Sequence, residues 1–429
     1  MADRLRPFFC DHLSILRGKY LPAAKIGDDA TRFCRSTFGV HYDKELLPAP
    51  GAMMMEGLPD MTLSWKAAEI RDGWEPRTKV VMGDLFDQDG TPLPMCPRGA
   101  LKRALDGWQT HGLSPKIGIE LEAYAFTRNA EGQIVPYDTP GGVVYGTGPY
   151  ADPLGFNDAI WDMAEQAGFR LDLITNEYDH PQYEYTLGYD SALAAVDAAV
   201  LFRQAAREVA FKHGIILTFL PKPIPGKGGS GMHVNFSFAN AQGHNALSNG
   251  PIGGPEYLTD LARGCVAGLV HHHKGLAGLI APTAGSYLRL QPASLSGFWR
   301  NWGGDHRNVT TRVSAEGGAK ARLEHRMADA SANPYTAVAA VLQAARLGYE
   351  GKYPLPPKET GDGFAATDTD QGTATDLAGA IADLIADTAL SSAVGQGLVD
   401  NHAFMKQQEV VKTADLSPDA LRDFYIHFV

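Results

Sequence analysis

The chain has 429 residues, a formal net charge of −11, 44% hydrophobic residues and 20% charged residues. This composition is typical of a globular protein with one large or two moderate domains, and the negative charge argues against nucleic acid and anionic membranes as partners. The four cysteines are scattered without CxxC spacing, so we expect neither a zinc cluster nor a disulfide framework. The N-terminal residues lack a long apolar segment and no stretch approaches membrane-spanning length, so we expect a soluble, cytoplasmic protein.

The first 94 residues mix short helix and strand signals. We expect a helix near Ala30–Phe38 and strands at Thr62–Lys66 and Lys79–Phe86. Two prolines, Pro94 and Pro97, mark a boundary between this region and the rest of the chain. The predicted domains are 1–94 and 95–429.

Helical and strand-like segments alternate after this boundary. We expect an amphipathic helix over Arg98–His111, and a second helix over Asn157–Gly168 that follows a long Gly-, Pro- and Tyr-rich loop at 131–156. A third helix is expected from an N-cap at Ser191 to His213, where a glycine ends it. This helix connects two strand-like segments and therefore predicts a βαβ unit.

The segment Lys116–Ala125, KIGIELEAYA, alternates apolar and polar side chains as a β-strand does. Glu120 and Glu122 fall on the same face of this strand. Two neighbouring carboxylates repel each other unless water or a cation separates their charges. The pair is therefore a candidate cation ligand.

Two further strand-like segments also project acidic side chains from one face. In Asp179–Leu187 the shared face carries Gln182, Glu184 and Thr186, and Glu177 lies just upstream. In Ala321–Met327 the shared face carries Arg322, Glu324 and Arg326.

A fourth segment, Ile215–Phe238, reads as a strand, a glycine-rich loop and a second strand. In the second strand, His233, Asn235 and Ser237 fall on one face and apolar side chains on the other. The loop glycines leave backbone N–H groups free to approach an anion, although the spacing is not that of a Walker A motif. Taken alone, this segment is equally well explained as a hairpin with a solvated face.

Four strands with acidic or metal-binding groups on one face favour a common explanation. A barrel or strongly curved sheet would collect these carboxylates, the imidazole and the arginines in its interior. The alternative is a set of four independent strand faces, each exposed to water.

The motifs, taken together, resemble those of the glutamine synthetase superfamily. The residues that carry the resemblance are GIELE at 118–122, Glu177 with Gln182-Tyr-Glu184, KPIPGKGGSGMHVNFS at 222–237, SYLRL at 286–290 and LEHRMADASANPY at 323–335. The details look most like the branch that joins glutamate to amines, the γ-glutamylpolyamine and γ-glutamylalkylamide synthetases. The resemblance implies an α+β fold: a small N-terminal β-grasp domain and a large catalytic domain with a curved, barrel-like antiparallel sheet and surrounding helices.

The resemblance also implies a divalent metal centre and ATP as co-substrate. Hard oxygen ligands with one imidazole suit Mg²⁺ or Mn²⁺, and the family pattern implies two or three such ions per site. By resemblance, Glu122, Glu177 and Glu184 hold the metal near the γ-carboxylate of glutamate. The metal on the nucleotide phosphates would be held by Glu120, His233 and Glu324.

Four arginines and the loop glycines take roles in the same pattern. By resemblance, Arg289 and Arg326 bind the amino-acid substrate and its reacting carboxyl, and Arg307 and Arg312 face the phosphoryl group that is transferred. The residues around the nucleotide would be Asn235 and Ser237. Gly229 and Gly231 would let the loop backbone approach glutamate.

One departure from the family pattern concerns the nucleophile. The ammonia-using enzymes usually carry Tyr-Glu where this chain has Ser294–Leu295, and that glutamate helps to bind and deprotonate ammonium. Since leucine cannot hold a cation, we expect a small primary amine in place of ammonia. The alternatives are a true glutamine synthetase that uses ammonia and a non-catalytic family member that binds glutamate or nucleotide as a sensor.

The family pattern finally implies a homo-oligomer, a dodecamer of two hexameric rings. In that assembly an acidic loop of the N-terminal domain completes the neighbouring subunit's site, and Asp60 is the candidate, with an ordinary surface aspartate as the alternative. Tyr353 lies in a segment that resembles the tyrosine loop adenylylated in some bacterial members. The surrounding insertion is shorter here, so we do not predict that modification.

Overall fold

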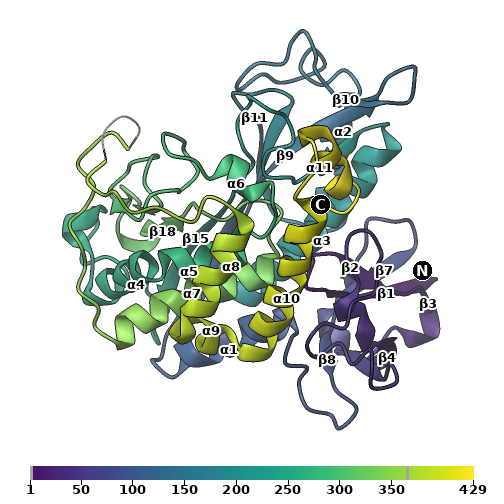
Figure 1. Ribbon diagram of the computed structural model, residues 1–429, viewed down its shortest axis with the longest axis horizontal. Helices are drawn as coiled ribbons and strands as arrows, with labels where there is room; N and C mark the ends of the chain where they lie inside the picture. Colours follow the sequence, from purple (N-terminus) through teal and green to yellow (C-terminus); the bar gives the residue numbers. More distant parts are fainter. Residues whose placement is uncertain (1–2, 364–366) are drawn as a thin grey trace.

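The computed structural model of the chain describes residues 3–363 and 367–429 (Figure 1). The N-terminal strands, coloured purple, gather on one side of the molecule, and the long C-terminal helix α10 (Gln396–Thr413) lies between them and the helices α7 (Pro334–Glu350) and α9 (Thr388–Val394). The amide of Asn401 on α10 donates hydrogen bonds to the carbonyl oxygens of Phe38 at 3.1 Å and Pro50 at 2.9 Å. The helix therefore ties the two regions together.

The N-terminal region contains two small sheets. In the first, β1 and β7 run parallel at the centre and β2, β3 and β6 pair antiparallel with them. The second sheet is antiparallel, in the order β4-β5-β8. Their bounds are β1 Arg4–Cys10, β2 Leu16–Gly18, β3 Leu21–Pro22, β4 Asp29–Cys34, β5 Asp60–Trp65, β6 Arg71–Asp72, β7 Thr78–Met82 and β8 Asp84–Phe86.

The prediction of a helix near Ala30–Phe38 is wrong. Asp29–Cys34 is strand β4, followed by a 3₁₀ turn at Arg35–Gly39. Every residue of β4 pairs with β5. The ring of Phe33 packs edge-on against that of Phe9, with 5.0 Å between the ring centroids. Tertiary pairing thus decided the conformation of a segment whose local signals were weak. The strand prediction at Thr62–Lys66 is confirmed by β5. The segment Lys79–Phe86 was predicted as one strand, but it forms two, β7 and β8, which are separated at Gly83 and belong to different sheets. The β-grasp assignment and the division at residue 94 stay predictions.

The large region is built on a ten-stranded sheet. Its hydrogen-bonded order is β11-β12-β9-β15-β18-β17-β16, with β10, β13 and β14 also paired to β9. All described pairs are antiparallel except β16 with β17. The bounds are β9 Ser114–Arg128, β10 Ile134–Pro136, β11 Leu171–Asn176, β12 Gln182–Leu187, β13 Asp190–Ser191, β14 Ile216–Thr218, β15 Met232–Ala239, β16 Trp302–Gly303, β17 Thr311–Val313 and β18 Leu323–His325.

The order of the described strands is open, from β11 at one edge to β16 at the other. No closed barrel is present among residues 3–363 and 367–429. The expected mixture of helices and a mainly antiparallel sheet is confirmed, and the barrel-like curvature stays a prediction.

Helices cover the apolar face of this sheet. The ring of Trp108 on α1 (Pro97–Gln109) packs against that of Phe238 on β15, with 4.3 Å between the ring centroids. Helix α3 (Ala192–Lys212) packs against β9. These contacts belong to the larger hydrophobic core. The other helices are α2 Phe156–Gln166, α4 Asp260–His271, α5 His273–Ile280, α6 Ser286–Arg289, α7 Pro334–Glu350, α8 Leu377–Ala386, α9 Thr388–Val394 and α11 Pro418–Tyr425. Since one sheet face is buried under helices, the polar side chains of the same strands project from the opposite face.

The helices predicted after residue 95 match α1, α2 and α3, and α3 does begin after Ser191. It connects β12 with β14, which both run antiparallel to β9 and therefore parallel to each other. No single helix in the described part of the chain is long and apolar enough to span a bilayer. Only α8 and α9 taken together are long and apolar enough, and the chain bends by 85° between them.

Candidate active site

Strand register brings the polar faces of β9, β12, β15 and β18 into one surface. Glu184 of β12 pairs with Glu122 of β9, and Glu120 of β9 pairs with His233 of β15. One strand further, Glu324 of β18 pairs with Asn235 of β15. These side chains come from strands that are far apart in the sequence, and they lie side by side on the face of the sheet that the helices leave open.

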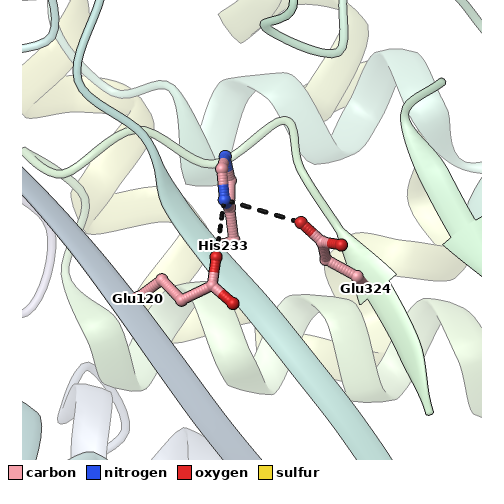
Figure 2. Close-up of side chains that lie close together, drawn as sticks. All are labelled: Glu120, His233 and Glu324. Carbon is pink, nitrogen blue, oxygen red and sulfur yellow. Dashed lines mark hydrogen bonds and ion pairs between the residues drawn. The ribbon is translucent and has the colours of Figure 1, made fainter. Parts of the chain in front are cut away.

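Glu120, His233 and Glu324 form a compact cluster (Figure 2). The imidazole Nδ1 of His233 lies 3.0 Å from Oε2 of Glu120 and 3.5 Å from Oε1 of Glu324. One ligand atom from each residue lies within 4.8 Å of the other two. Three ligand atoms at this spacing are close enough together to contact a single divalent cation.

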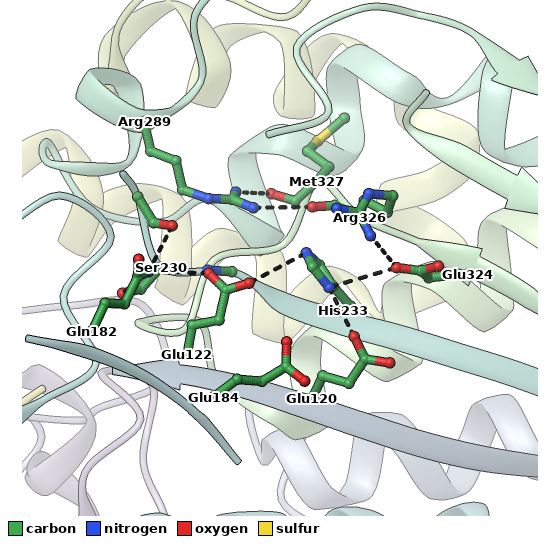
Figure 3. Close-up of polar contacts among 12 residues, drawn as sticks. Glu120, Glu122, Gln182, Glu184, Ser230, His233, Arg289, Glu324, Arg326 and Met327 are labelled. Carbon is green, nitrogen blue, oxygen red and sulfur yellow. Dashed lines mark hydrogen bonds and ion pairs between the residues drawn. The ribbon is translucent and has the colours of Figure 1, made fainter. Parts of the chain in front are cut away.

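A second set of carboxylates lies beside this cluster (Figure 3). Oε1 of Glu122 is 3.9 Å from Nε2 of His233, and its other oxygen accepts a hydrogen bond of 2.7 Å from the backbone N–H of Gly231. Glu184 accepts a hydrogen bond of 2.9 Å from the hydroxyl of Thr186. Glu177 lies in the turn between β11 and β12, where the charge of Glu122 acts on it.

The crowding of carboxylates changes their protonation. Burial, together with the charges of Glu120 and Glu122, raises the pKa of Glu184 to about 7. Burial and the charge of Glu122 also raise the pKa of Glu177. For Glu120, burial acts in the same direction, but the hydrogen bond and charge of His233 outweigh it and lower the pKa to about 2. The carboxyl group of Glu184 therefore exchanges a proton near neutral pH.

Two of the predicted arginines meet at Glu324. Arg312 donates a hydrogen bond of 2.9 Å to Oε2 of Glu324 and another of 2.9 Å to Asp305, and Arg326 pairs with Oε1 of Glu324. The candidate cation ligand is thus held between two guanidinium groups. This arrangement places positive charge next to the acidic cluster.

Arg289 lies buried under the glycine-rich loop. Its guanidinium donates to the carbonyl oxygens of Met327 at 2.7 Å and Arg326 at 3.1 Å (Figure 3). The loop glycines are packed against it: a Cβ at Gly229 would lie 2.5 Å from Cγ of Arg289, and one at Gly231 would lie 2.8 Å from both Nη2 of Arg289 and Nε2 of His233. The two glycines are therefore required for this close approach.

We expect Gly231→Ala to lower turnover at least about tenfold, since displacement of a guanidinium or imidazole by a fraction of an ångström disturbs positioning. The thermal midpoint should change little, because the added methyl group meets two polar side-chain ends. Steady-state kinetics and thermal unfolding measure both effects. Gly250→Ala is the matched control, since its Cβ would meet nothing within 4 Å. Full activity of Gly231→Ala would show that this packing is not needed.

A cavity of about 370 Å³ adjoins the cluster and extends over β15. Glu120, Asn235 and Ser237 line it, and the amide of Asn235 donates a hydrogen bond of 3.0 Å to Glu120. Positive side chains from Lys116, Lys320 and Arg322 stand around the same cavity. Arg322 was expected to share a face with Glu324 and Arg326, but it lies outside β18 and pairs with Glu316.

Arg307 and Leu295 lie on loops outside the sheet. Arg307 is exposed between β16 and β17, although its charge acts on Glu177. The side chain of Leu295 follows α6 and is 47% exposed. Asp60 is exposed at the start of β5. The roles predicted for these three residues are therefore not tested by contacts within one chain.

Gln182 has a structural role that the sequence pattern did not assign. Its side-chain amide lies 3.3 Å from Glu122, 3.1 Å from the carbonyl oxygen of Gly229 and 3.3 Å from the hydroxyl of Ser230. It thereby joins a carboxylate of the cluster to the glycine-rich loop (Figure 3). The alternation of Gln182 with Glu184 placed it on the correct face, but only the tertiary structure shows its partners.

Comparison with known proteins agrees with this geometry. The family described as "Glutamine synthetase, catalytic domain" matches residues 94–422. A glutamine synthetase from Thermococcus kodakarensis is 34% identical over 325 residues, which are 73% of this chain and 68% of the relative. A gamma-glutamylputrescine synthetase from Escherichia coli K12 is 32% identical, covering 81% and 76% of the two chains. A glutamate–isopropylamine ligase from a Pseudomonas species is 29% identical, covering 83% and 80%.

A crystal structure of a glutamine synthase homologue has a TM-score of 0.84 to this chain at 27% identity, and covers 100% of this chain and 99% of its own. The resemblance inferred from the motifs is confirmed. The family match extends over most of the chain, so this protein belongs to the glutamine synthetase family of ATP-dependent glutamate ligases, and its relatives include glutamate–amine ligases.

Proposed function

We propose that this protein joins the γ-carboxylate of glutamate to a small primary amine through a γ-glutamyl phosphate formed with ATP. The observation that carries the proposal is the cluster of Glu120, His233 and Glu324, flanked by Arg312 and Arg326. Making an amide from a carboxylate requires an activated carboxyl, and a phosphoryl transfer of this kind depends on positioning and on neutralising charge.

The donor set fits Mg²⁺ or Mn²⁺, because it consists of carboxylate oxygens and one imidazole without thiolates. We assign Glu120, His233 and Glu324 to a metal on the nucleotide side. For the metal on the glutamate side we assign Glu122, Glu177 and Glu184. When bound, these ions neutralise phosphate charge and polarise the phosphoryl oxygens.

The cavity over β15 is the proposed nucleotide site. Asn235 and Ser237 line it. Arg312 does not line the cavity but contacts Glu324 of the neighbouring cluster, and we assign it to the phosphate end of the nucleotide. Three cationic side chains, Lys116, Lys320 and Arg322, line the cavity together with three acidic ones, Glu120, Asp172 and Glu316, so the assignment rests on Asn235 and Ser237 and not on the charge of the lining. Asn235 also orients Glu120 by its hydrogen bond, so a single residue connects the nucleotide site with the acidic cluster.

The glutamate site is proposed between the glycine-rich loop and the buried arginines. Arg289 and Arg326 would bind the carboxylates of the amino acid, and the backbone at Gly229 and Gly231 would approach it closely. Arg307 is proposed to stabilise the charge that develops as the phosphoryl group is transferred. Its exposure in the single chain leaves its side chain free to meet a ligand.

The choice of a small amine rests on Leu295 in place of an acidic residue. Ammonium has to lose its charge and hydration before it attacks, and an apolar side chain offers no acceptor for the proton. An alkyl substituent gains about 0.8 kcal/mol for each methylene that becomes buried. The alternatives remain a glutamine synthetase that uses ammonia and a glutamate or nucleotide sensor, and the sensor is disfavoured because all six proposed ligand positions carry metal-binding side chains.

We expect kcat/KM to be higher for methylamine or isopropylamine than for ammonium or putrescine, with ATP and glutamate saturating. Phosphate release is the measurement, and product masses identify the amide. Ammonium as the best of the four would replace this proposal with glutamine synthetase activity. Absence of turnover with any of them would favour the sensor.

The affinity for the divalent cation should depend on pH. The pKa of Glu184 is raised to about 7, so a proton competes with the metal below that pH and is released on binding. We expect the apparent affinity for Mn²⁺ to be about tenfold weaker at pH 6 than at pH 8. Calorimetric titration in two buffers measures affinity and proton release. Glu184→Gln should weaken binding and reduce its pH dependence, and equal affinity of the wild type at both pH values would contradict the assignment.

We also propose that the active assembly is a dodecamer of two hexameric rings. Support comes from the loop before β5, where Met55 and Leu58 expose large apolar side chains next to the exposed Asp60. Such a loop is suited to burial against a neighbouring copy, whose site the carboxylate of Asp60 would then complete. Light scattering during gel filtration gives the subunit number.

A further inference from the structure

Helix α3 carries a buried arginine, Arg203, that makes no ion pair in the described part of the chain. The residue is 6% exposed. Its Nη1 donates hydrogen bonds to the carbonyl oxygens of Ala330 at 2.9 Å and Ala332 at 3.1 Å, and its Nη2 donates to the carbonyl oxygen of Ser14 at 2.9 Å and to the hydroxyl of the same serine. Burial of a guanidinium without a paired carboxylate is unfavourable, so these contacts, and not packing, account for an arginine here.

The serine that Arg203 contacts belongs to a rigid turn of the N-terminal region, between β1 and β2. The buried carboxylate of Asp11 accepts hydrogen bonds of 2.9 Å from the backbone N–H groups of Leu13 and Ile15. Ser14 has a φ of +68°, a left-handed conformation that persists only where the surroundings impose it. The turn is therefore fixed, and Arg203 joins it to the backbone that follows β18.

The backbone that follows β18 also borders the proposed glutamate site. Its first two carbonyl oxygens, those of Arg326 and Met327, accept the hydrogen bonds of Arg289 (Figure 3). Further along, the N–H of Ala330 donates to the carbonyl oxygen of Ser230 in the glycine-rich loop at 3.3 Å. One short segment thus receives a guanidinium of the proposed glutamate site at one end and the guanidinium from α3 at the other.

We propose that Arg203 is a positioning residue for glutamate, because it holds the segment after β18 against the N-terminal turn and this segment orients Arg289 and the glycine-rich loop. The inference rests on the proposed function, since it takes the amino acid to bind at Arg289. A packed interior transmits a shift of the backbone from one end of such a segment to the other. A misplacement of about 1 Å caused far from the reacting atoms can lower the rate about a hundredfold. The proposed nucleotide cavity is lined by other residues, so binding of ATP should respond much less.

The test measures binding of glutamate by calorimetry, with Mg²⁺ and a saturating non-hydrolysable ATP analogue, so that no nucleophile is needed. Arg203→Met removes the guanidinium and is expected to weaken glutamate binding about tenfold or more. Binding of the analogue itself should change less than about twofold. Arg203→Lys keeps a charge that can donate to some of these oxygens but lacks the planar fork that reaches them all, so an intermediate loss is expected.

Ser14→Gly tests the same contact from the other side. It removes the hydroxyl that accepts from Arg203, and glycine tolerates the left-handed backbone. We expect glutamate binding to weaken about threefold, while the thermal midpoint stays close to that of the wild type. This variant therefore separates positioning from stability if Arg203→Met does not fold.

Arg207→Met is the matched control. Arg207 lies one turn further along α3 and also donates to a carbonyl oxygen, that of Phe428 near the C-terminus, at 2.9 Å. Its loss should leave glutamate binding unchanged. If Arg203→Met and Ser14→Gly bind glutamate as the wild type does, or lose glutamate and the ATP analogue equally, Arg203 has no positioning role and the proposed function stands. If the wild type itself binds no glutamate, the proposed function fails and this inference with it.

Discussion

Glu324→Gln is expected to lower turnover by at least about a hundredfold, the scale seen when one preorganised electrostatic contact is removed. The substitution preserves the size of the side chain but removes the charge that meets Arg312, Arg326 and His233. A neutral amide cannot balance two guanidinium groups or hold a divalent cation as a carboxylate does. Initial rates over a range of Mg²⁺ concentrations measure the loss, and Mn²⁺ binding should weaken in parallel.

Glu350→Gln is the control for this substitution. It breaks an ion pair of similar length with Arg346 on the surface of α7 and should leave turnover unchanged. Circular dichroism and thermal unfolding separate a lost site from a lost fold. Wild-type turnover of Glu324→Gln at ordinary Mg²⁺ concentrations would remove this residue from the proposed metal site.

Arg307→Ala is expected to lower kcat by about a hundred- to a thousandfold, with much smaller changes in KM for ATP and glutamate. An interaction made only as charge develops in the transition state affects kcat and not substrate binding. Because Arg307 is exposed on its loop, its removal should cost little stability. Pre-steady-state formation of ADP can show whether acyl phosphate formation is the step that slows, because phosphate itself leaves only after the amine attacks.

Arg307→Lys keeps the positive charge but not the planar fork, so a partial recovery is expected. Arg263→Ala on α4 removes another exposed arginine and serves as the control, with turnover expected to match the wild type. If Arg307→Ala turns over normally, the arginine has no part in phosphoryl transfer.

Much of the candidate site follows from local pattern. The alternation of Glu120 and Glu122, of Gln182 and Glu184, and of His233 and Asn235 predicts which side chains share a face, because successive residues of a strand point to opposite sides. The same alternation predicted the strands that became β9, β12 and β15. Together with the ordered motifs, it was sufficient to infer the family.

The N-terminal region was harder to predict because strand β4 shows little alternation of apolar and polar side chains. Its strands are short, and β4 adopts its conformation through pairing with β5, some thirty residues further along. A segment such as Asp29–Cys34 carries little local preference, so its hydrogen-bonding partners decide its structure.

The sequence by itself determined which side chains share a strand face, which carboxylates and imidazole are candidate metal ligands, and the family to which this protein belongs. Only the tertiary structure decided which faces meet, since strand register depends on hydrogen bonds between segments that are far apart in the chain. It placed Glu324 next to His233, buried Arg289 beneath Gly229 and Gly231, and gave Gln182 its partners. It also left Arg307 and Leu295 on exposed loops, where no periodic pattern constrains the position of a side chain.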